Sequence, residues 1–505
     1  MCKIETNQKQ FIDKYVKIEK RGDKMDDFIR PQKKVEKKKK NHKSIKEIFI
    51  IMGIIICLGL GYVAGYMSKK TTVVEKESTQ KNIVLEAYES LSQYWVNSGD
   101  DIDFDEAVLK GMVAGLGDPY SSVLTSQEAV DFNQSVSGIY QGIGISYSPV
   151  EKGILVTKVY DNSPAQKGGL KAADIIVKVD QTNLEGLSDD KIKECIKGDE
   201  GTEVSLSILR NNQTMHFQIK RESLDLSTFY EIRKNNKNSF GYIELSTFGV
   251  DTAKQVEEAL QYFQDKKIDT LVLDLRDNGG GYLLAAQDIL DLFFTSDEVI
   301  YQQQEKNDSP KKYKAESDSC YQFKNNYILI NENTASASEL TAGALQSEKG
   351  FQLIGEKSYG KGTVQTQKVL SDGTVLKYTY AKWLLPNGKS IHGKGLTPDV
   401  EVSGISLDGI STGEVDQVYQ MDCVSSYVSS MQKMLKALGY QVDREDGYFS
   451  KGSCEALKAF EKDYYLTING EYDENDKKML MAQLLVRIRN HENDQQYQRL
   501  MEIIG

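Results

Sequence analysis

The hydrophobic pattern of the chain is dominated by one long apolar run, Ile48–Met67, which contains 20 residues and no charge. A helix of this length is long enough to cross a bilayer. A basic stretch with six lysines, Lys33–Lys40, precedes it. These lysines argue against a buried helix of a soluble domain and orient the tail towards the cytoplasm. The pattern predicts a basic cytoplasmic tail over residues 1–46 and an uncleaved single-pass transmembrane helix over residues 47–68, with the remainder outside the cell membrane.

Strand and helix patterns follow a polar linker predicted over residues 69–81. Helical spacing of apolar residues predicts helix over Asn82–Gly115, within a helical segment over residues 82–135. The short apolar runs Phe240–Leu245 and Leu271–Leu275 predict strands with an amphipathic helix between them. Strands alternating with helices indicate a mixed α/β core.

A serine lies between a predicted strand, Tyr327–Ile330, and a predicted helix, Glu339–Gln346. At such a junction the hydroxyl of Ser336 is exposed beside unpaired backbone N–H groups and the positive end of the helix dipole. These are the conditions that stabilise an oxyanion. The alternative is a serine that only caps the helix.

A lysine bracketed by glycines, Lys361, follows the next predicted strand, Phe351–Gly355. The flanking glycines allow close backbone packing, so that the amine can be buried and its pKa lowered. A neutral lysine can accept the proton of a serine. The alternative is a lysine that simply lies at the protein surface.

Length, charge and histidine content limit the number of domains and the kinds of partner and cofactor that we expect. At 505 residues, the chain has room for about three domains. Residues 1–46 hold 16 basic and 7 acidic side chains, a net charge of +9, whereas the remainder holds 47 and 67, a net charge of −20. The acidic body argues against nucleic acid as a partner. The four histidines do not cluster, so we expect no metal site and no cofactor.

The cysteines give no motif. They are Cys2, Cys57, Cys195, Cys320, Cys423 and Cys454, and none forms a CxxC pair. The outer four could form disulfides, but their spacing does not indicate a pairing.

Two motifs carry a family resemblance. The segment TASASELTAGALQ, followed by GEKSYGKGTVQ, resembles the active site of the carboxyl-terminal processing proteases, the serine–lysine peptidases of family S41. The resemblance implies that Ser336 is the nucleophile, that Lys361 is the general base, and that Gln365 orients the lysine. It also implies a protease core of the ClpP/crotonase type over residues 222–403, together with the helical part over residues 82–135.

The stretch DLRDNGGG, at Asp274–Gly281, resembles another segment of the same family. The resemblance implies an oxyanion hole formed by the N–H of Gly279 or Gly280 together with that of Ala337. Glycines at a strand end also serve simply as turns, which is the alternative. The stretch GLGDPYSSVL, at Gly115–Leu124, also resembles a motif of this family, and we interpret it as a turn that packs one helix on the next.

An inserted β-rich PDZ domain is expected over residues 136–221, because Gln141–Ile145 and the following GILVTKVYDNSPAQKGGLKAADIIVKVD resemble that domain. Exposed glycine N–H groups can receive a terminal carboxylate, and a strand edge can pair with an extended peptide. The alternative is a PDZ fold retained as a spacer. The residues expected to bind the peptide end are Gly142, Ile143, Gly144 and Ile145.

The end of the chain is predicted to hold a linker over residues 404–420, a small all-α domain over 421–482 and a terminal helix over 483–505. The small domain resembles the peptidoglycan-binding domain of cell-wall hydrolases, although Glu461 stands where glutamine is usual. Docking or dimerisation without glycan contact is the alternative. Three leucines are expected to be buried near the terminal helix: Leu480, Leu484 and Leu485.

The sequence thus predicts a multidomain, membrane-anchored serine endopeptidase with a Ser-Lys dyad. Its substrates would be extracytoplasmic proteins with apolar C-termini that the PDZ domain recognises. Peptidoglycan and the membrane are further expected partners, and the resemblance implies a homodimer. The alternative is a non-catalytic, membrane-tethered adaptor that binds protein tails and peptidoglycan. A peptidoglycan hydrolase finds no support in the catalytic residue types present.

Overall fold

The computed structural model describes residues 83–96, 103–236, 238–405, 409–411, 413–488, 490 and 493–505. The predicted tail over 1–46, anchor over 47–68 and linker over 69–81 lie outside these residues. Within the described ranges, no helix combines the length and the hydropathy needed to cross a bilayer. The chain divides into two compact units, Met1–Tyr94 and Trp95–Gly505.

The helical pattern over Asn82–Gly115 corresponds to two helices rather than one. The described part of the first unit is helix α3 (Ile83–Tyr94), which buries none of its residues. In the second unit, α4 (Phe104–Ala114) begins after Asp103, whose side chain accepts a hydrogen bond from the N–H of Glu106. This N-cap starts a new helix and explains the division.

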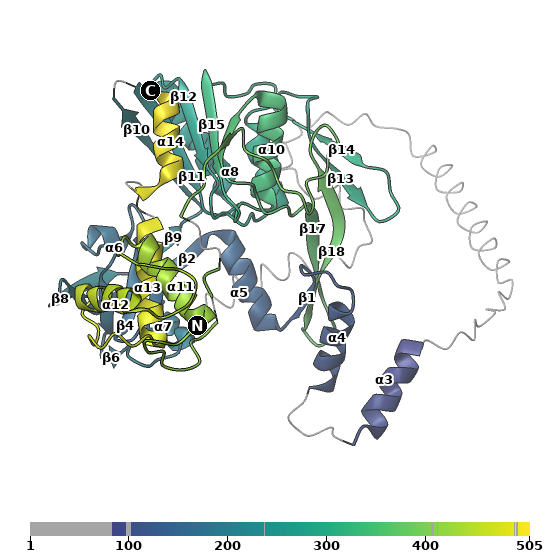
Figure 1. Ribbon diagram of the computed structural model, residues 1–505. Helices are drawn as coiled ribbons and strands as arrows, with labels where there is room; N and C mark the ends of the chain where they lie inside the picture. Colours follow the sequence, from purple (N-terminus) through teal and green to yellow (C-terminus); the bar gives the residue numbers. More distant parts are fainter. Residues whose placement is uncertain are drawn as a thin grey trace, which may run out of the picture. The chain divides into compact units, whose positions relative to one another are not determined.

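A six-stranded sheet forms the centre of an α/β core in the second unit, with the strand order β10-β11-β12-β15-β16-β19 (Figure 1). Its strands are parallel except for the β10–β11 hairpin. Their bounds are β10 Thr228–Asn235, β11 Asn238–Leu245, β12 Thr270–Asp274, β15 Asn325–Ile330, β16 Gln352–Gly355 and β19 Val400–Glu401.

Helices cover both faces of this sheet. One face packs on α8 (Thr252–Asp265), α9 (Leu283–Asp291) and α10 (Ala337–Lys349), and the other packs on α14 (Gln495–Ile504). Burial from both sides explains the uninterrupted apolar run of β12. The mixed α/β architecture predicted for the core is confirmed.

A second, five-stranded sheet lies beside the core and carries the lysine segment. Strand β18 pairs with β1, β13 and β17, and β14 pairs with β13. Helix α5 (Ser126–Ser137) follows β1 and begins with a capping box between Thr125 and Glu128. The strand bounds are β1 Ser122–Leu124, β13 Val299–Glu305, β14 Lys311–Lys314, β17 Thr363–Val369 and β18 Val375–Leu384.

The β-rich insertion is an antiparallel sheet in the order β3-β4-β5-β7-β8, with β6 paired to β5. The pair β2–β9 lies at the ends of the insertion. Its helices are α6 (Pro164–Lys167) and α7 (Asp189–Ile196). The strand bounds are β2 Ile139–Gly142, β3 Ile145–Val150, β4 Gly153–Val159, β5 Ile175–Val179, β6 Thr182–Asn183, β7 Glu203–Arg210, β8 Gln213–Lys220 and β9 Glu222–Asp225.

The C-terminal domain consists of α11 (Ser426–Ala437), α12 (Lys451–Asp463) and α13 (Glu474–Ile488). Helix α13 also packs against β3 and β4 of the insertion. Glu461 is fully buried and accepts hydrogen bonds from the N–H groups of Asn469 and Gly470. The departure from glutamine at this position is therefore accommodated inside the domain.

The predicted single terminal helix over residues 483–505 is wrong. Helix α13 ends at Ile488, and α14 begins after Asp494, whose carboxylate accepts from the N–H of Tyr497. An aspartate in this position caps a new helix and favours a break in the preceding one. Of the three leucines expected to be buried, Leu480 and Leu484 are buried, whereas Leu485 is only half-buried.

Candidate active site

Ser336 occupies a strained junction between β15 and α10. Its backbone has φ 57° and ψ −117°, in a region that non-glycine residues rarely adopt. The preceding loop is fixed to the end of β12, because Thr334 Oγ1 donates to the carbonyl of Leu275 at 2.9 Å and the N–H of Ala335 donates to that of Asn278 at 3.0 Å. These contacts hold the half-buried Ser336 side chain at the start of a buried helix.

Lys361 is half-buried at the start of the second sheet, two residues before β17. Burial lowers the pKa of its ammonium group, and the charge of Lys377 lowers it further. The carboxylates of Asp118 and Glu339 act in the opposite direction without reversing the shift. The amine is thereby more easily deprotonated than an ordinary lysine, as a general base requires.

Glu339 joins the serine and lysine segments, a role that sequence reasoning missed. This fully buried carboxylate accepts hydrogen bonds from the N–H of Ser336 at 2.9 Å and the N–H of Lys361 at 2.8 Å. It also accepts from Gly360 N–H at 2.7 Å and Ser358 Oγ at 2.5 Å. The Ser-x-x-Glu spacing is a capping-box signal that could have indicated this position.

The turn at Gly117–Ser122 lies against the lysine segment. Lys361 Nζ is 4.9 Å from the centre of the Tyr120 ring, and the N–H of Thr379 in β18 donates to Ser121 Oγ at 3.1 Å. The turn therefore packs against β18 and Lys361.

Gln365 lies on β17 and lines the same cavity as Lys361. Its amide nitrogen donates to Thr363 Oγ1 at 3.1 Å and to Thr379 Oγ1 at 3.0 Å. Among the hydrogen bonds of the described residues, none joins Gln365 to Lys361. His392 accepts from the N–H of Gly362 through Nδ1 at 3.3 Å.

The two candidate oxyanion glycines differ in their surroundings. The N–H of Gly280 donates to Asn278 Oδ1 at 2.9 Å and is therefore occupied, so Gly280 cannot serve as the donor in this structure. Gly279 faces open space, and its N–H and that of Ala337 have no hydrogen bond within the described part of the chain. The available pair is thus Gly279 and Ala337, the latter at the N-terminus of α10.

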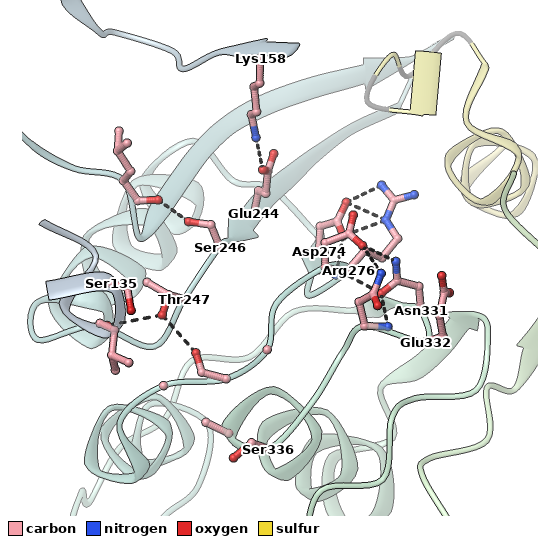
Figure 2. A pocket seen from close by; sticks show the side chains of 18 of the residues that line it. Ser135, Lys158, Glu244, Ser246, Thr247, Asp274, Arg276, Asn331, Glu332 and Ser336 are labelled. Carbon is pink, nitrogen blue, oxygen red and sulfur yellow. Dashed lines mark hydrogen bonds and ion pairs between the residues drawn. The ribbon is translucent and has the colours of Figure 1, made fainter. Parts of the chain in front are cut away.

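These residues share a cavity of about 1430 Å³. Its walls include Ser336, Lys361, Gln365, Gly279, Gly280 and Ala337, together with residues of the insertion and of the C-terminal segment. Figure 2 shows two ion pairs on these walls, Lys158–Glu244 and Asp274–Arg276. The first joins β4 of the insertion to β11 of the core, with 2.5 Å between Lys158 Nζ and Glu244 Oε1.

The four residues expected to bind a peptide end lie apart from this cavity's walls. Gly142, Ile143 and Gly144 are buried, and Ile145 is half-buried at the start of β3. The loop packs on the start of α6, because the carbonyl of Ile143 accepts from the N–H of Ala165 at 2.8 Å. Gly144 has φ 80°, and an added Cβ would lie 2.4 Å from Ser163 Cβ, so this position requires glycine.

Comparison with known families accounts for most of the second unit. The family model "Peptidase family S41" matches residues 239–402, and "PDZ domain" matches residues 141–220. "Putative peptidoglycan binding domain" matches residues 425–480.

The chain is also similar to whole proteins. It is 33% identical over 451 residues to "Probable CtpA-like serine protease" of Staphylococcus haemolyticus (strain JCSC1435), covering 88% of this chain and 90% of that relative. It is 33% identical over 422 residues to "Carboxy-terminal processing protease CtpB" of Bacillus subtilis (strain 168), covering 83% and 88%. Among solved structures, the photosystem II D1 C-terminal processing protease aligns with 25% identity, a TM-score of 0.41, and coverage of 64% of this chain and 92% of that one. The chain therefore belongs to the carboxy-terminal processing proteases of family S41 and is a serine endopeptidase.

Proposed function

We propose that Ser336 and Lys361 form the catalytic dyad of this peptidase. Ser336 Oγ attacks the scissile carbonyl carbon, and its proton passes to the neutral amine of Lys361. The N–H groups of Gly279 and Ala337 donate to the resulting oxyanion. The C–N bond then breaks, and the leaving amine takes the proton from Lys361. Water, deprotonated by Lys361, hydrolyses the acyl-enzyme and frees Ser336.

The observation that carries this proposal is the common environment of the two residues. A strained serine at a helix N-terminus and a half-buried lysine with a lowered pKa line one cavity. No histidine lines the described walls of that cavity, so the lysine is the available base. Gln365 supports the β17–β18 scaffold of the lysine through its threonine contacts, and we propose that it orients Lys361 in the substrate complex.

We propose that substrates are proteins with apolar C-termini, which bind the PDZ domain at Gly142–Ile145. The domain contributes Lys158 and its neighbours to the wall of the catalytic cavity. The Lys158–Glu244 ion pair therefore offers a direct connection between peptide binding and the core. Replacing the last residue of a substrate by aspartate should slow cleavage, because a charged side chain is costly to bury in an apolar pocket.

We propose that the peptidase is anchored by Ile48–Met67, with its catalytic part outside the cytoplasm. The support is the uncharged run and the basic stretch before it. The C-terminal domain would bind peptidoglycan, in keeping with its family match. A homodimer is proposed from the family resemblance alone, and light scattering of the purified chain in detergent would test it.

The catalytic proposal is tested with the full chain in detergent micelles. Cleavage of an unfolded protein with an apolar C-terminus is compared between the wild type and the variants Ser336→Ala and Lys361→Ala. We expect both variants to be folded and to lose activity by at least about 10³-fold. Full activity in either variant would disprove the dyad. An inactive wild type that also fails to react with serine-directed probes would support the adaptor alternative.

A further inference from the structure

The C-terminal segment reaches the loop that carries the candidate oxyanion donor. Asp494 lies beyond the residues matched by the three family models, and its carboxylate accepts from Arg276 NH1 at 2.6 Å. The two residues are 218 positions apart in the sequence. Arg276 directly precedes Asp277–Gly280, the segment that bends around the start of α10. A residue outside the matched peptidase domain thus contacts the entrance to this loop.

Arg276 is held from two sides in a largely buried site. Its Nε and NH2 groups donate to the carboxylate of Asp274 at 2.5–3.1 Å, and its NH1 group donates to Asp494. The side chains of Arg276 and Asp494 retain 14% and 9% of their exposure. Because a guanidinium ion presents donors along two edges, Asp274 satisfies one edge, while NH1 donates to Asp494 and, at 3.4 Å, to Gln496 Oε1.

Asp494 is itself fixed in place. It caps α14, and the neighbouring Gln496 donates through Nε2 to Glu356 Oε2 and to the carbonyl of Val402, both at 3.1 Å. Leu500, one helical turn further on, is fully buried against the central sheet. The start of α14 is therefore a rigid wall of the catalytic cavity rather than a loosely attached tail.

The residue directly after Arg276 is fixed by a second set of contacts. Asp277 has φ 57°, and its Oδ1 accepts from the side-chain amides of Asn331 at 2.8 Å and Asn333 at 2.9 Å. Asn331 and Asn333 belong to the loop that leads into Ser336. Arg276, held by the C-terminal segment, and Asp277, held by the serine loop, are therefore both fixed just before Asn278 and Gly279.

We propose that Asp494 is a positioning residue of the peptidase: by holding Arg276, it keeps the N–H of Gly279 aimed at the oxyanion. This inference rests on the proposed catalytic roles of Ser336 and Gly279. It assigns the C-terminal segment a part in the turnover step, independent of any glycan binding by the domain before it.

The test uses Asp494→Ser in the full chain. Serine keeps the helix cap but is too short to reach Arg276. We expect kcat for a peptide substrate to fall about 10- to 10²-fold with KM unchanged, because a small misplacement of a catalytic group is costly even when binding is intact. The thermal unfolding midpoint should fall, because a largely buried guanidinium loses one partner, but the variant should remain folded at the assay temperature. Asp494→Glu, which retains the carboxylate, should recover part of the loss.

Glu502→Ser is the matched control, because Glu502 lies on the same helix and pairs with the exposed side chain of Arg499. The double variant Asp494→Ser/Arg276→Gln should be no slower than Arg276→Gln alone, because the contact between the two side chains is already lost in Arg276→Gln. Unchanged kcat in Asp494→Ser, additive losses, or an equal loss in Glu502→Ser would overturn the inference. If Ser336→Ala also remained active, the proposed dyad itself would fail, whereas an inactive Ser336→Ala would confine the failure to Asp494.

Discussion

The backbone N–H groups of Ser336 and Lys361 donate to the same carboxylate oxygen, Oε2 of Glu339, at 2.9 and 2.8 Å. The other oxygen accepts from Ser358 and Gly360. One buried side chain therefore fixes the spacing between the candidate nucleophile and the candidate base.

Replacing Glu339 by glutamine should damage both activity and stability. One of the two oxygens becomes an NH2 group, which leaves at least one buried pair of donors unsatisfied. Each buried donor without a partner costs about 1–3 kcal/mol. We expect the free energy of unfolding of the core, followed by the fluorescence of buried Trp383, to fall by about 2 kcal/mol or more, and kcat to fall with it.

Glu348→Gln is the control for this change, because Glu348 is exposed on the same helix. It should leave both quantities unchanged. Normal activity and stability in Glu339→Gln would show that the shared carboxylate is dispensable.

The pH dependence of catalysis should follow Lys361. Its pKa lies below the ordinary 10.5 because of burial and the charge of Lys377. Only the neutral amine can accept a proton, so kcat/KM should decrease as the pH falls through this lowered pKa. Lys377→Gln removes the repulsion and raises the pKa of Lys361. The profile should therefore move to higher pH, with lower activity at neutral pH.

Lys382→Gln, an exposed change on the same strand, should leave the profile in place. A shift to lower pH in Lys377→Gln, or a wild-type profile that stays flat from pH 6 to 9, would contradict a lysine base.

Replacement by alanine should have different effects at Gly279 and Gly280, the two candidate oxyanion glycines. An alanine Cβ at Gly280, where φ is 103°, would lie 2.9 Å from both the carbonyl oxygen of Ala335 and Ser336 Cβ. At Gly279 it would meet nothing within 4 Å. We expect Gly280→Ala to lower kcat about 10²-fold by displacing the loop, and Gly279→Ala to affect mainly KM. Steady-state kinetics of the two variants would measure both parameters. Equal losses of kcat in Gly279→Ala and Gly280→Ala would contradict the expected difference between the two glycines.

The C-terminal domain should become less stable as the pH rises. Burial raises the pKa of Asp476 from 3.8 to about 8. Between these values the unfolded carboxyl group is ionised while the folded one keeps its proton, so stability decreases with increasing pH across this range. Asp476→Asn should increase the protection of α11–α13 against hydrogen exchange at pH 7, measured relative to the intrinsic exchange rate. The decrease in this protection with rising pH should disappear in the variant. Faster exchange in the variant would show that the ionised carboxylate stabilises the domain.

The successful predictions rest on patterns among residues that are close together in the sequence. The apolar runs of β12 and β15 and the periodicity of α8 are signals that neighbouring residues contain, and the S41 motifs placed Ser336 and Lys361 in segments that meet in one cavity. The resemblances to the PDZ and peptidoglycan-binding domains could also be recognised from the sequence, because each depends on a short run of glycine and apolar positions.

Contacts between distant segments were not predictable in this way. Nothing near Arg276 indicates that Asp494 completes its hydrogen bonds, and nothing near Gly117–Ser122 indicates contact with Lys361. The choice between Gly279 and Gly280 also required the structure, since it depends on a single bond from Gly280 N–H to Asn278. The terminal helix was mispredicted because the capping signal at Asp494 was weaker than the helical pattern around it.

The most direct test of the account is the covalent labelling of Ser336. The full chain is treated with a fluorophosphonate probe, and the adduct is located by mass spectrometry. We expect a single labelled site at Ser336, no label in Ser336→Ala, and labelling at least about 10²-fold slower in Lys361→Ala. Labelling of a different serine, or an unchanged rate in Lys361→Ala, would contradict the serine–lysine dyad.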